Sequence, residues 1–185
     1  MHSLSDRRRS PRRRHLLPLA ILALGAVLAG WPTMALAEEV ECNSIRLEMA
    51  SEGYDLTCDT DSGSDMTFET LEANSSDGTH FLVIGDLVTS YRNIFPGGGS
   101  LRKNLTDAFG SLDVEDWRSG KSQQGLTTAE FASDYKTIPS ACVGFQGYFH
   151  KERGGWRRYV IGFGCSRVGD RSQIYDALRH VEFPD

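Results

Sequence analysis

Apolar residues recur along this chain in several short runs that are separated by turn sequences, a pattern typical of β-strands. The longest such stretch, residues 142–165, contains the turn sequence ERGG near its centre. Two more strand-like segments, MTFETLE (66–72) and THFLVIGDLV (79–88), flank the turn sequence NSSDG. Polar and glycine-rich turns between such segments predict β-hairpins. We therefore expect much of the chain to fold as antiparallel hairpins.

Helix signals occupy three other segments. SLRKNLTDAFG (100–110) predicts a short helix that begins near Ser100, and TTAEFASDY (127–135) predicts a second one. In DRSQIYDALRHVEF (170–183) an aspartate and a glutamine three residues later occupy capping-box positions, and apolar residues recur at helical spacing. Together these elements predict an α+β domain, with a mainly antiparallel sheet of about six strands built from hairpins, two short helices, and a C-terminal helix packed on the sheet.

The segment 142–165 also indicates how its two strands pair. A turn at ERGG places Phe163 opposite Gly144 and Phe145 opposite Gly162. An aromatic ring that covers a glycine on the neighbouring strand fills the space of the missing side chain. Two such pairs in one register support that register.

Four cysteines follow the N-terminal segment, and none belongs to a C-x-x-C pair, which favours disulfides over a zinc site or a redox motif. The register above places Cys142 opposite Cys165. Cys42 and Cys58 bracket a second, shorter predicted hairpin with its turn at ASEG. Four cysteines allow three connectivities, and these positions favour two local crosslinks. On a chain-entropy model, closing the loop between Cys142 and Cys165 contributes about 3 kcal/mol to stability.

The first 37 residues have the three regions of a secretory signal peptide. Six arginines precede the apolar run 16–30, which is shorter than the roughly 20 residues that a membrane-spanning helix needs. The small residues Ala35 and Ala37 then predict cleavage after Ala37. We expect a signal peptide over 1–37 and a single disulfide-stapled domain over 38–185, located in the periplasm or secreted.

The sequence RRHLL (13–17) also loosely fits a twin-arginine signal, although a Sec signal is the favoured interpretation. The alternative for the whole segment is an uncleaved membrane anchor. After cleavage we expect no stable membrane insertion, and the sequence predicts no particular oligomeric state.

Charge is distributed unevenly along the chain. The net charge of −5 becomes −10 once the predicted signal peptide, with its six arginines and one aspartate, is removed. Residues 38–90 hold thirteen carboxylates and the single cation Arg46, whereas residues 141–185 hold seven cations and five carboxylates. An acidic domain argues against a nucleic-acid partner. The acidic half is interpreted as a solvated surface that keeps an exported protein in solution.

One face of the predicted hairpin combines basic and aromatic residues. Its register places His150 opposite Arg157, with Tyr148 and Tyr159 next along the same face and Arg153 near the turn. Such a strip suits an anionic sugar, a peptide carboxylate or an acidic protein surface. The alternative is a half-buried sheet face whose aromatic residues pack under the last helix.

The sequence FPGGGSLRK (95–103) offers a second candidate anion site. A helix N-terminus at Ser100 presents unpaired N–H groups, and Arg102 and Lys103 add positive charge. The alternative is a flexible loop that enters a capped helix. Ser100 and Lys103 also match the S-x-x-K pattern of penicillin-binding enzymes, but the companion motifs of those enzymes are missing from the sequence.

The run DTDSGSDMTFE (59–69) carries carboxylates of the kind that calcium prefers, but its spacing departs from an EF-hand loop, and a solvated turn is the favoured interpretation. No cofactor or metal is predicted.

These observations favour a non-enzymatic domain of the cell envelope that binds a protein or envelope component through the hairpin face and the loop after Tyr91. The alternative is a small periplasmic hydrolase whose catalytic groups converge from distant segments, with Ser100, His150 and an aspartate as candidates.

Overall fold

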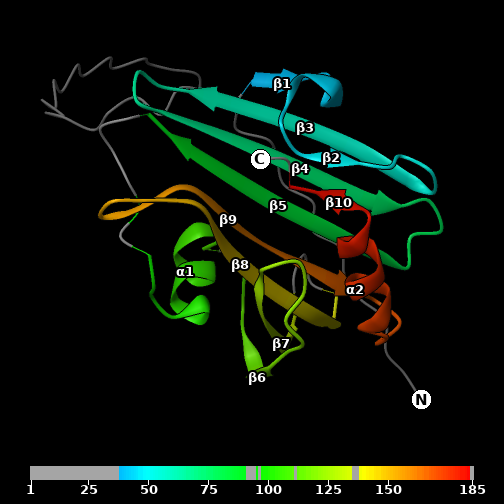
Figure 1. The fold of residues 1–185 in the computed structure, drawn as a ribbon. Helices are drawn as coiled ribbons and strands as arrows, with labels where there is room; N and C mark the ends of the chain where they lie inside the picture. Colours follow the sequence, from blue (N-terminus) through cyan, green and yellow to red (C-terminus); the bar gives the residue numbers. More distant parts are fainter. Residues whose placement is uncertain (1–37, 91–94, 96, 111, 135–137, 184–185) are drawn as a thin grey trace, which may run out of the picture. The chain divides into compact units, whose positions relative to one another are not determined.

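An eight-stranded antiparallel sheet dominates the computed structural model, with strand order β1-β3-β4-β5-β9-β8-β7-β6 (Figure 1). The structure describes residues 38–90, 95, 97–110, 112–134 and 138–183. The predicted signal peptide therefore lies outside the described residues. The strands of this sheet are β1 (Glu38–Val40), β3 (Tyr54–Ser62), β4 (Met66–Ser75), β5 (His80–Thr89), β6 (Glu115–Ser119), β7 (Thr127–Ser133), β8 (Ser140–Glu152) and β9 (Gly155–Ser166).

Smaller elements complete the domain. Strands β2 (Glu48–Met49) and β10 (Val181–Glu182) form a separate two-stranded antiparallel sheet. In the described part of the chain, the helices are the single 3-10 turn η1 (Cys42–Ser44) and the α-helices α1 (Leu101–Ala108) and α2 (Ser172–Arg179). The fold is thus α+β and mainly antiparallel, as predicted.

The two α-helices cover opposite faces of the main sheet. Successive side chains of a strand point to opposite faces. Leu82 and Ile84 of β5 share one core cluster with α2, whereas Phe81 and Val83 of the same strand share the other cluster with α1. We call these two sides the α2 face and the α1 face. Helix α1 packs over β7, β8 and β9, so it covers only one half of its face (Figure 1).

The predicted register of the β8–β9 hairpin is confirmed. Phe145 pairs with Gly162, and a Cβ atom on Gly162 would lie 2.5 Å from the Phe145 ring, so the ring fills the glycine's space. Phe163 pairs with Gly144 as predicted, but the space beside Gly144 is filled mainly by Leu105 of α1, whose side chain would lie 2.3 Å from an added Cβ. Gly144 therefore lets α1 approach the sheet closely.

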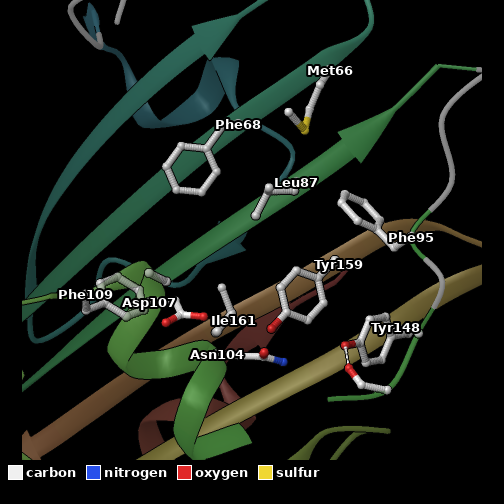
Figure 2. Close-up of a pocket in the computed structure, with 13 residues that line it drawn as sticks. Met66, Phe68, Leu87, Phe95, Asn104, Asp107, Phe109, Tyr148, Tyr159 and Ile161 are labelled. Carbon is white, nitrogen blue, oxygen red and sulfur yellow. Dashed lines mark hydrogen bonds between the residues drawn. The ribbon is translucent and has the colours of Figure 1, made fainter. Parts of the chain in front are cut away.

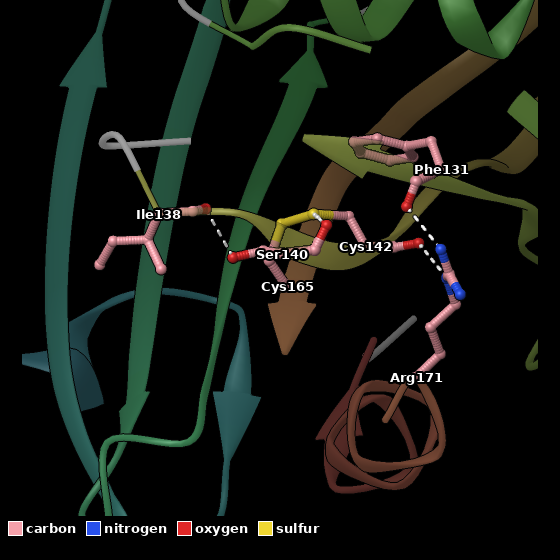
Figure 3. The surroundings of a disulfide bond; sticks show 6 residues. All are labelled: Phe131, Ile138, Ser140, Cys142, Cys165 and Arg171. Atoms are coloured by element: carbon pink, nitrogen blue, oxygen red, sulfur yellow. Dashed lines mark hydrogen bonds between the residues drawn. A yellow bond between two sulfur atoms is a disulfide. The ribbon is translucent and has the colours of Figure 1, made fainter. Parts of the chain in front are cut away.

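Both predicted disulfides are present, Cys42–Cys58 and Cys142–Cys165, with Cα atoms 5.2 and 4.1 Å apart. Cys142 and Cys165 are fully buried on paired strands in the centre of the sheet. Figure 3 shows that Arg171, which precedes α2, donates hydrogen bonds to the carbonyl oxygens of Cys142 and Phe131 at 3.2 and 3.0 Å. The arginine therefore fixes the start of α2 against β7 and β8.

The prediction of a short hairpin inside the Cys42–Cys58 loop is wrong. The turn is present, because the N–H of Tyr54 donates to the carbonyl oxygen of Ser51 at 3.0 Å. However, β2 pairs with β10, and β3 pairs with β1 and β4. Strand β3 is nine residues long, and pairing along β4 satisfies far more of its backbone groups than a short hairpin would.

The prediction of about six strands and of a helix at 127–135 is also corrected. The main sheet has eight strands, and Thr127–Ser133 is strand β7, paired with β8. Thr128, Ala129 and Phe131 are all buried because both faces of β7 are partly covered. That burial removes the strict alternation of a half-exposed strand, and the remaining pattern resembles a helical one.

The C-terminal helix is confirmed but shorter than predicted. Asp170 accepts a hydrogen bond from the N–H of Ser172 at 2.9 Å, and hydrogen bonding by the Ser172 side chain and by this N–H lowers the pKa of the Asp170 carboxyl group. Gln173 does not complete a capping box, because its side-chain oxygen accepts a hydrogen bond from Ser166 Oγ at 3.0 Å. The helix ends at Arg179, and Val181 belongs to β10.

Candidate functional site

A cavity of about 570 Å³ opens on the α1 face, between α1 and the part of the sheet that α1 leaves uncovered (Figure 2). We call it the aromatic pocket. Its volume lies within the range of about 300–1,000 Å³ that is usual for small-molecule sites. It is lined by Met66, Phe68, Leu87, Phe95, Gly97, Gly98, Asn104, Asp107, Ala108, Phe109, Tyr148, Tyr159 and Ile161.

The sheet wall of the pocket comes from three neighbouring strands. Phe68 of β4 pairs with Leu87 of β5, and both lie on the α1 face together with Tyr159 and Ile161 of β9. The Phe68 ring lies over Gly85, where an added Cβ would come within 2.8 Å of it. This glycine therefore lets the ring lie flat against the sheet and keeps the pocket open above it.

Stacked tyrosines form the hairpin side of the pocket. Tyr148 and Tyr159 are cross-strand partners whose ring centroids lie 4.8 Å apart with an interplanar angle of 28°. The ring of Phe95 lies 5.7 Å from that of Tyr159. Three aromatic rings are thus held in contact at one end of the cavity (Figure 2).

The polar side chains beside these rings bond to one another. The side-chain oxygen of Gln146 accepts hydrogen bonds from Asn104 Nδ2 at 2.8 Å and from Tyr159 Oη at 3.2 Å. Tyr148 Oη donates to the carbonyl oxygen of Gly98. Burial raises the pKa of both tyrosines, and for Tyr159 the proximity of Tyr148 adds to the rise. Both hydroxyls therefore stay protonated at neutral pH and act as donors.

The glycine-rich loop is fixed by the hairpin. Phe95 and Trp156 exchange two backbone hydrogen bonds of 2.7 and 2.9 Å, and the Trp156 indole lies where a Cβ on Gly97 would be, at 2.7 Å. Gly97, Gly98 and Gly99 have φ values of 74°, 88° and 95°, in the left-handed region that other residues rarely adopt. The three glycines thus let this loop follow the tyrosine rings and form one wall of the pocket.

The structure brings only two of the predicted hairpin residues into the pocket. Tyr148 and Tyr159 line it, whereas His150 is exposed and has a φ of 56°. Arg153 is exposed in the turn, and Arg157 forms an ion pair with Glu152, with 2.6 Å between Nε and Oε1. The two tyrosines face α1, not the last helix, because α2 packs on the other face of the sheet.

The residues of the predicted anion site lie at the start of α1. Ser100 is exposed and precedes the helix without a side-chain capping bond. Arg102 donates to the carbonyl oxygen of Val114 at 3.0 Å, and Lys103 pairs with Asp107 on the surface of the helix. Both cations are therefore engaged within the domain, and their side chains are directed away from the helix N-terminus.

Carboxylates of the acidic run lie on both faces of the sheet. Asp59 and Asp61 lie on the α1 face, but Glu69 lies on the α2 face, where it accepts a hydrogen bond from the N–H of Arg46 at 2.8 Å. The side chains therefore do not converge on a single ion.

Sequence analysis missed the sheet wall of the pocket, Met66, Phe68 and Leu87. The turn at NSSDG pairs β4 with β5 and sets Phe68 opposite Leu87, so the common face of these two residues could be derived from the sequence. The sequence does not show that α1 ends before it covers them.

A second polar cluster joins the start of β5 to β3, away from the pocket. Thr79 Oγ1 donates to Asp77 Oδ1 at 2.8 Å, so its contact of 3.0 Å with His80 Nδ1 makes that nitrogen the donor. Nε2 is then the acceptor for Tyr54 Oη at 3.0 Å. Burial lowers the pKa of His80, and hydrogen bonds from Thr79 and Ser75 lower the pKa of Asp77 to about 2.

We predict that His80 makes the domain less stable in mild acid. Its folded-state pKa lies below the unfolded value of about 6.5, so the unfolded chain binds the proton first. The free energy of unfolding should fall as the pH is lowered from about 6.5 toward the folded-state pKa. Urea unfolding between pH 7 and pH 5 should show this fall, and His80→Gln should flatten it. An unchanged slope in His80→Gln would contradict the assignment.

Comparison with known protein families, curated proteins and solved structures finds no match for this chain. Within the described part of the chain, no helix has the length and hydropathy needed to cross a bilayer. The two disulfides fit an oxidising, exported environment.

Proposed function

We propose that this chain is an exported, non-enzymatic domain that binds its ligand by taking an apolar group into the aromatic pocket. The observation that carries the proposal is the lining of the cavity. Its sheet wall is made of apolar and aromatic side chains, and the hydroxyls of Tyr148 and Tyr159 already bond within the domain. What the pocket offers a ligand is therefore mainly hydrophobic and aromatic contact.

The geometry of the pocket limits which residues of the β8–β9 hairpin belong to the proposed binding site. The part of the hairpin that contributes to the proposed site is the pair Tyr148 and Tyr159, together with the glycine-rich loop that they hold. Export is proposed from the N-terminal arginine and apolar segments and is supported by the disulfides, which are retained in oxidising compartments.

Filling the pocket should abolish binding without unfolding the domain. Ala108 lines the pocket from an exposed position at the end of α1, so Ala108→Trp places a ring in the cavity and removes no buried core contact. Thr106→Trp is the matched control, because Thr106 is exposed on the same helix and does not line the pocket.

The uncharged dye N-phenylnaphthylamine is a suitable probe, because its fluorescence rises in apolar surroundings. We expect Ala108→Trp to weaken its binding by at least about 10-fold, or about 1.4 kcal/mol, and Thr106→Trp to leave it unchanged. Equal binding by both variants, or no binding by the parent protein, would contradict the proposal.

A further inference from the structure

We propose that the group bound in the aromatic pocket is a cation, an organic ammonium ion carried on an apolar or aromatic body. This inference rests on the proposed function, because it assigns a chemical class to the ligand of the same site. Three features of the α1 face support it: the aromatic rings, the carboxylates beside them, and the pairing of nearby positive charges.

Aromatic rings give the pocket an affinity for cations. The faces of Tyr and Phe rings carry partial negative charge and attract a cation within about 6 Å of the ring centroid. The lining includes five such rings, from Phe68, Phe95, Phe109, Tyr148 and Tyr159. Figure 2 shows that they approach the cavity from different elements, so a group at its centre meets rings on several sides.

Carboxylates flank the cavity on two sides. Asp107 lines it from α1. On the opposite side, Asp61 of β3 pairs directly with Phe68, and paired residues on one face have Cβ atoms about 4.5–5.5 Å apart. Asp59 lies two residues further along the same face of β3. Asp107 is already paired with Lys103, so the negative charge that a bound cation would meet unpaired is that of Asp59 and Asp61 on the sheet.

Among the described residues, no basic side chain is paired with the carboxylates on the α1 face of β3. Strands β1, β3, β4 and β5 contain no lysine or arginine. Within the described residues Asp59 and Asp61 form no ion pair. The cations close in sequence to the pocket lining are paired within the domain: Lys103 with Asp107, Arg157 with Glu152, and Arg158 with Asp86. The α1 face beside the pocket is thus acidic over β3 and the outer side of β4.

These features favour a cation over a neutral or anionic ligand. An anion would approach the carboxylates of β3 across an apolar surface that screens charge poorly. A quaternary or bulky ammonium ion suits the site because its charge is spread over apolar groups, so it makes cation–π contacts and still buries hydrocarbon.

Three matched probes test the inference. They are a phenylpropyl-trimethylammonium ion, its uncharged isostere with a tert-butyl group in place of the ammonium, and the corresponding phenylalkyl carboxylate. Binding is measured by titration calorimetry on the purified, disulfide-bonded protein at low and high salt. We expect the cation to bind at least about 10-fold more tightly than the neutral isostere, the carboxylate to bind least, and the cation's advantage to shrink with salt.

Variants that remove carboxylates test whether the preference for the cation comes from Asp59 and Asp61. Asp59→Asn/Asp61→Asn should reduce the affinity for the cation by about 5- to 10-fold and leave the affinity for the neutral isostere unchanged. Asp55→Asn is the control, because it removes the same charge from the same face of β3 about 20 Å from Asp61 along the strand, beyond the screening length of about 8 Å at physiological salt.

The outcomes separate this inference from the proposed function. A neutral isostere that binds as tightly as the cation, and is excluded by Ala108→Trp, would overturn the cation inference and leave the apolar pocket in place. A cation preference that is undiminished in Asp59→Asn/Asp61→Asn would overturn the role of the β3 carboxylates. If none of the three probes binds, both the inference and the proposed function fail.

Discussion

Replacing Asp86 with asparagine should lower the free energy of unfolding by about 3–5 kcal/mol. Asp86 and Arg158 form a bidentate ion pair between β5 and β9, with Nε–Oδ1 and Nη2–Oδ2 distances of 2.9 and 2.8 Å. Their side chains are 0% and 2% exposed. Loss of the carboxylate leaves a guanidinium in the core without its counter-charge, and that desolvation cost is the reason for the large effect.

A double-mutant cycle distinguishes this cause from a general loss of packing. Asp86→Asn/Arg158→Met removes both charges, so it should lose clearly less stability than the sum of the two single variants. Asp176→Asn removes one partner of the exposed pair with Arg179 and should cost less than about 1 kcal/mol. Additive losses in the cycle, measured by urea unfolding, would show that the ion pair is not the source of the effect.

Removing the central disulfide should give the second-largest effect. Cys142→Ala/Cys165→Ala should lose about 3 kcal/mol in denaturant unfolding, since the crosslink closes a loop with a sequence separation of 23. The Cys42–Cys58 disulfide closes a loop with a sequence separation of 16. Cys42→Ala/Cys58→Ala should therefore lose nearly as much stability, because the loop-closure entropy depends on the logarithm of loop length. Unchanged denaturation midpoints in both variants would contradict this expectation.

The stability that the two disulfides provide together indicates in which cellular compartment the chain can stay folded. Two crosslinks of about 3 kcal/mol each are a large part of the 5–15 kcal/mol that stabilises a typical domain. A chain kept in a reducing cytosol would therefore be only marginally stable, which supports the proposal that it is exported.

The centre of the fold could be predicted from the sequence because its signals are local. The turn at ERGG fixes the pairing of β8 with β9, and that pairing brings Cys142 and Cys165 together. In the same way the turn at NSSDG fixes the pairing of β4 with β5. The register of a hairpin depends on its turn and on the side-chain pattern of the two flanking strands, so a short stretch of sequence contains enough information to define it.

Elements whose partners are distant in sequence were not predictable in this way. Strand β2 pairs with β10, more than a hundred residues away, in place of its neighbour β3. Strand β7 has buried residues on both faces, Thr128 on one and Ala129 and Phe131 on the other, so its pattern lacks the alternation of a half-exposed strand. In both cases tertiary packing decides the structure.

In the candidate site, too, local pairings could be predicted from the sequence, whereas distant packing could not. Tyr148 and Tyr159 could be proposed as partners from the hairpin register, and their rings do stack. Phe68 and Leu87 could be assigned to a common face, but their role depends on where α1 ends above the sheet. The pocket is therefore defined by the placement of a helix of only eight residues.

Methionine-methyl NMR with N-phenylnaphthylamine tests the central claim most directly. The described residues hold two of the chain's four methionines: Met66 lines the aromatic pocket, and Met49 packs in the core of the opposite face. We predict that the ring current of the bound dye shifts the Met66 methyl signal saturably, that Met49 stays unmoved, and that Ala108→Trp abolishes the shift. An unmoved Met66 signal, or a shift confined to Met49, would contradict the account.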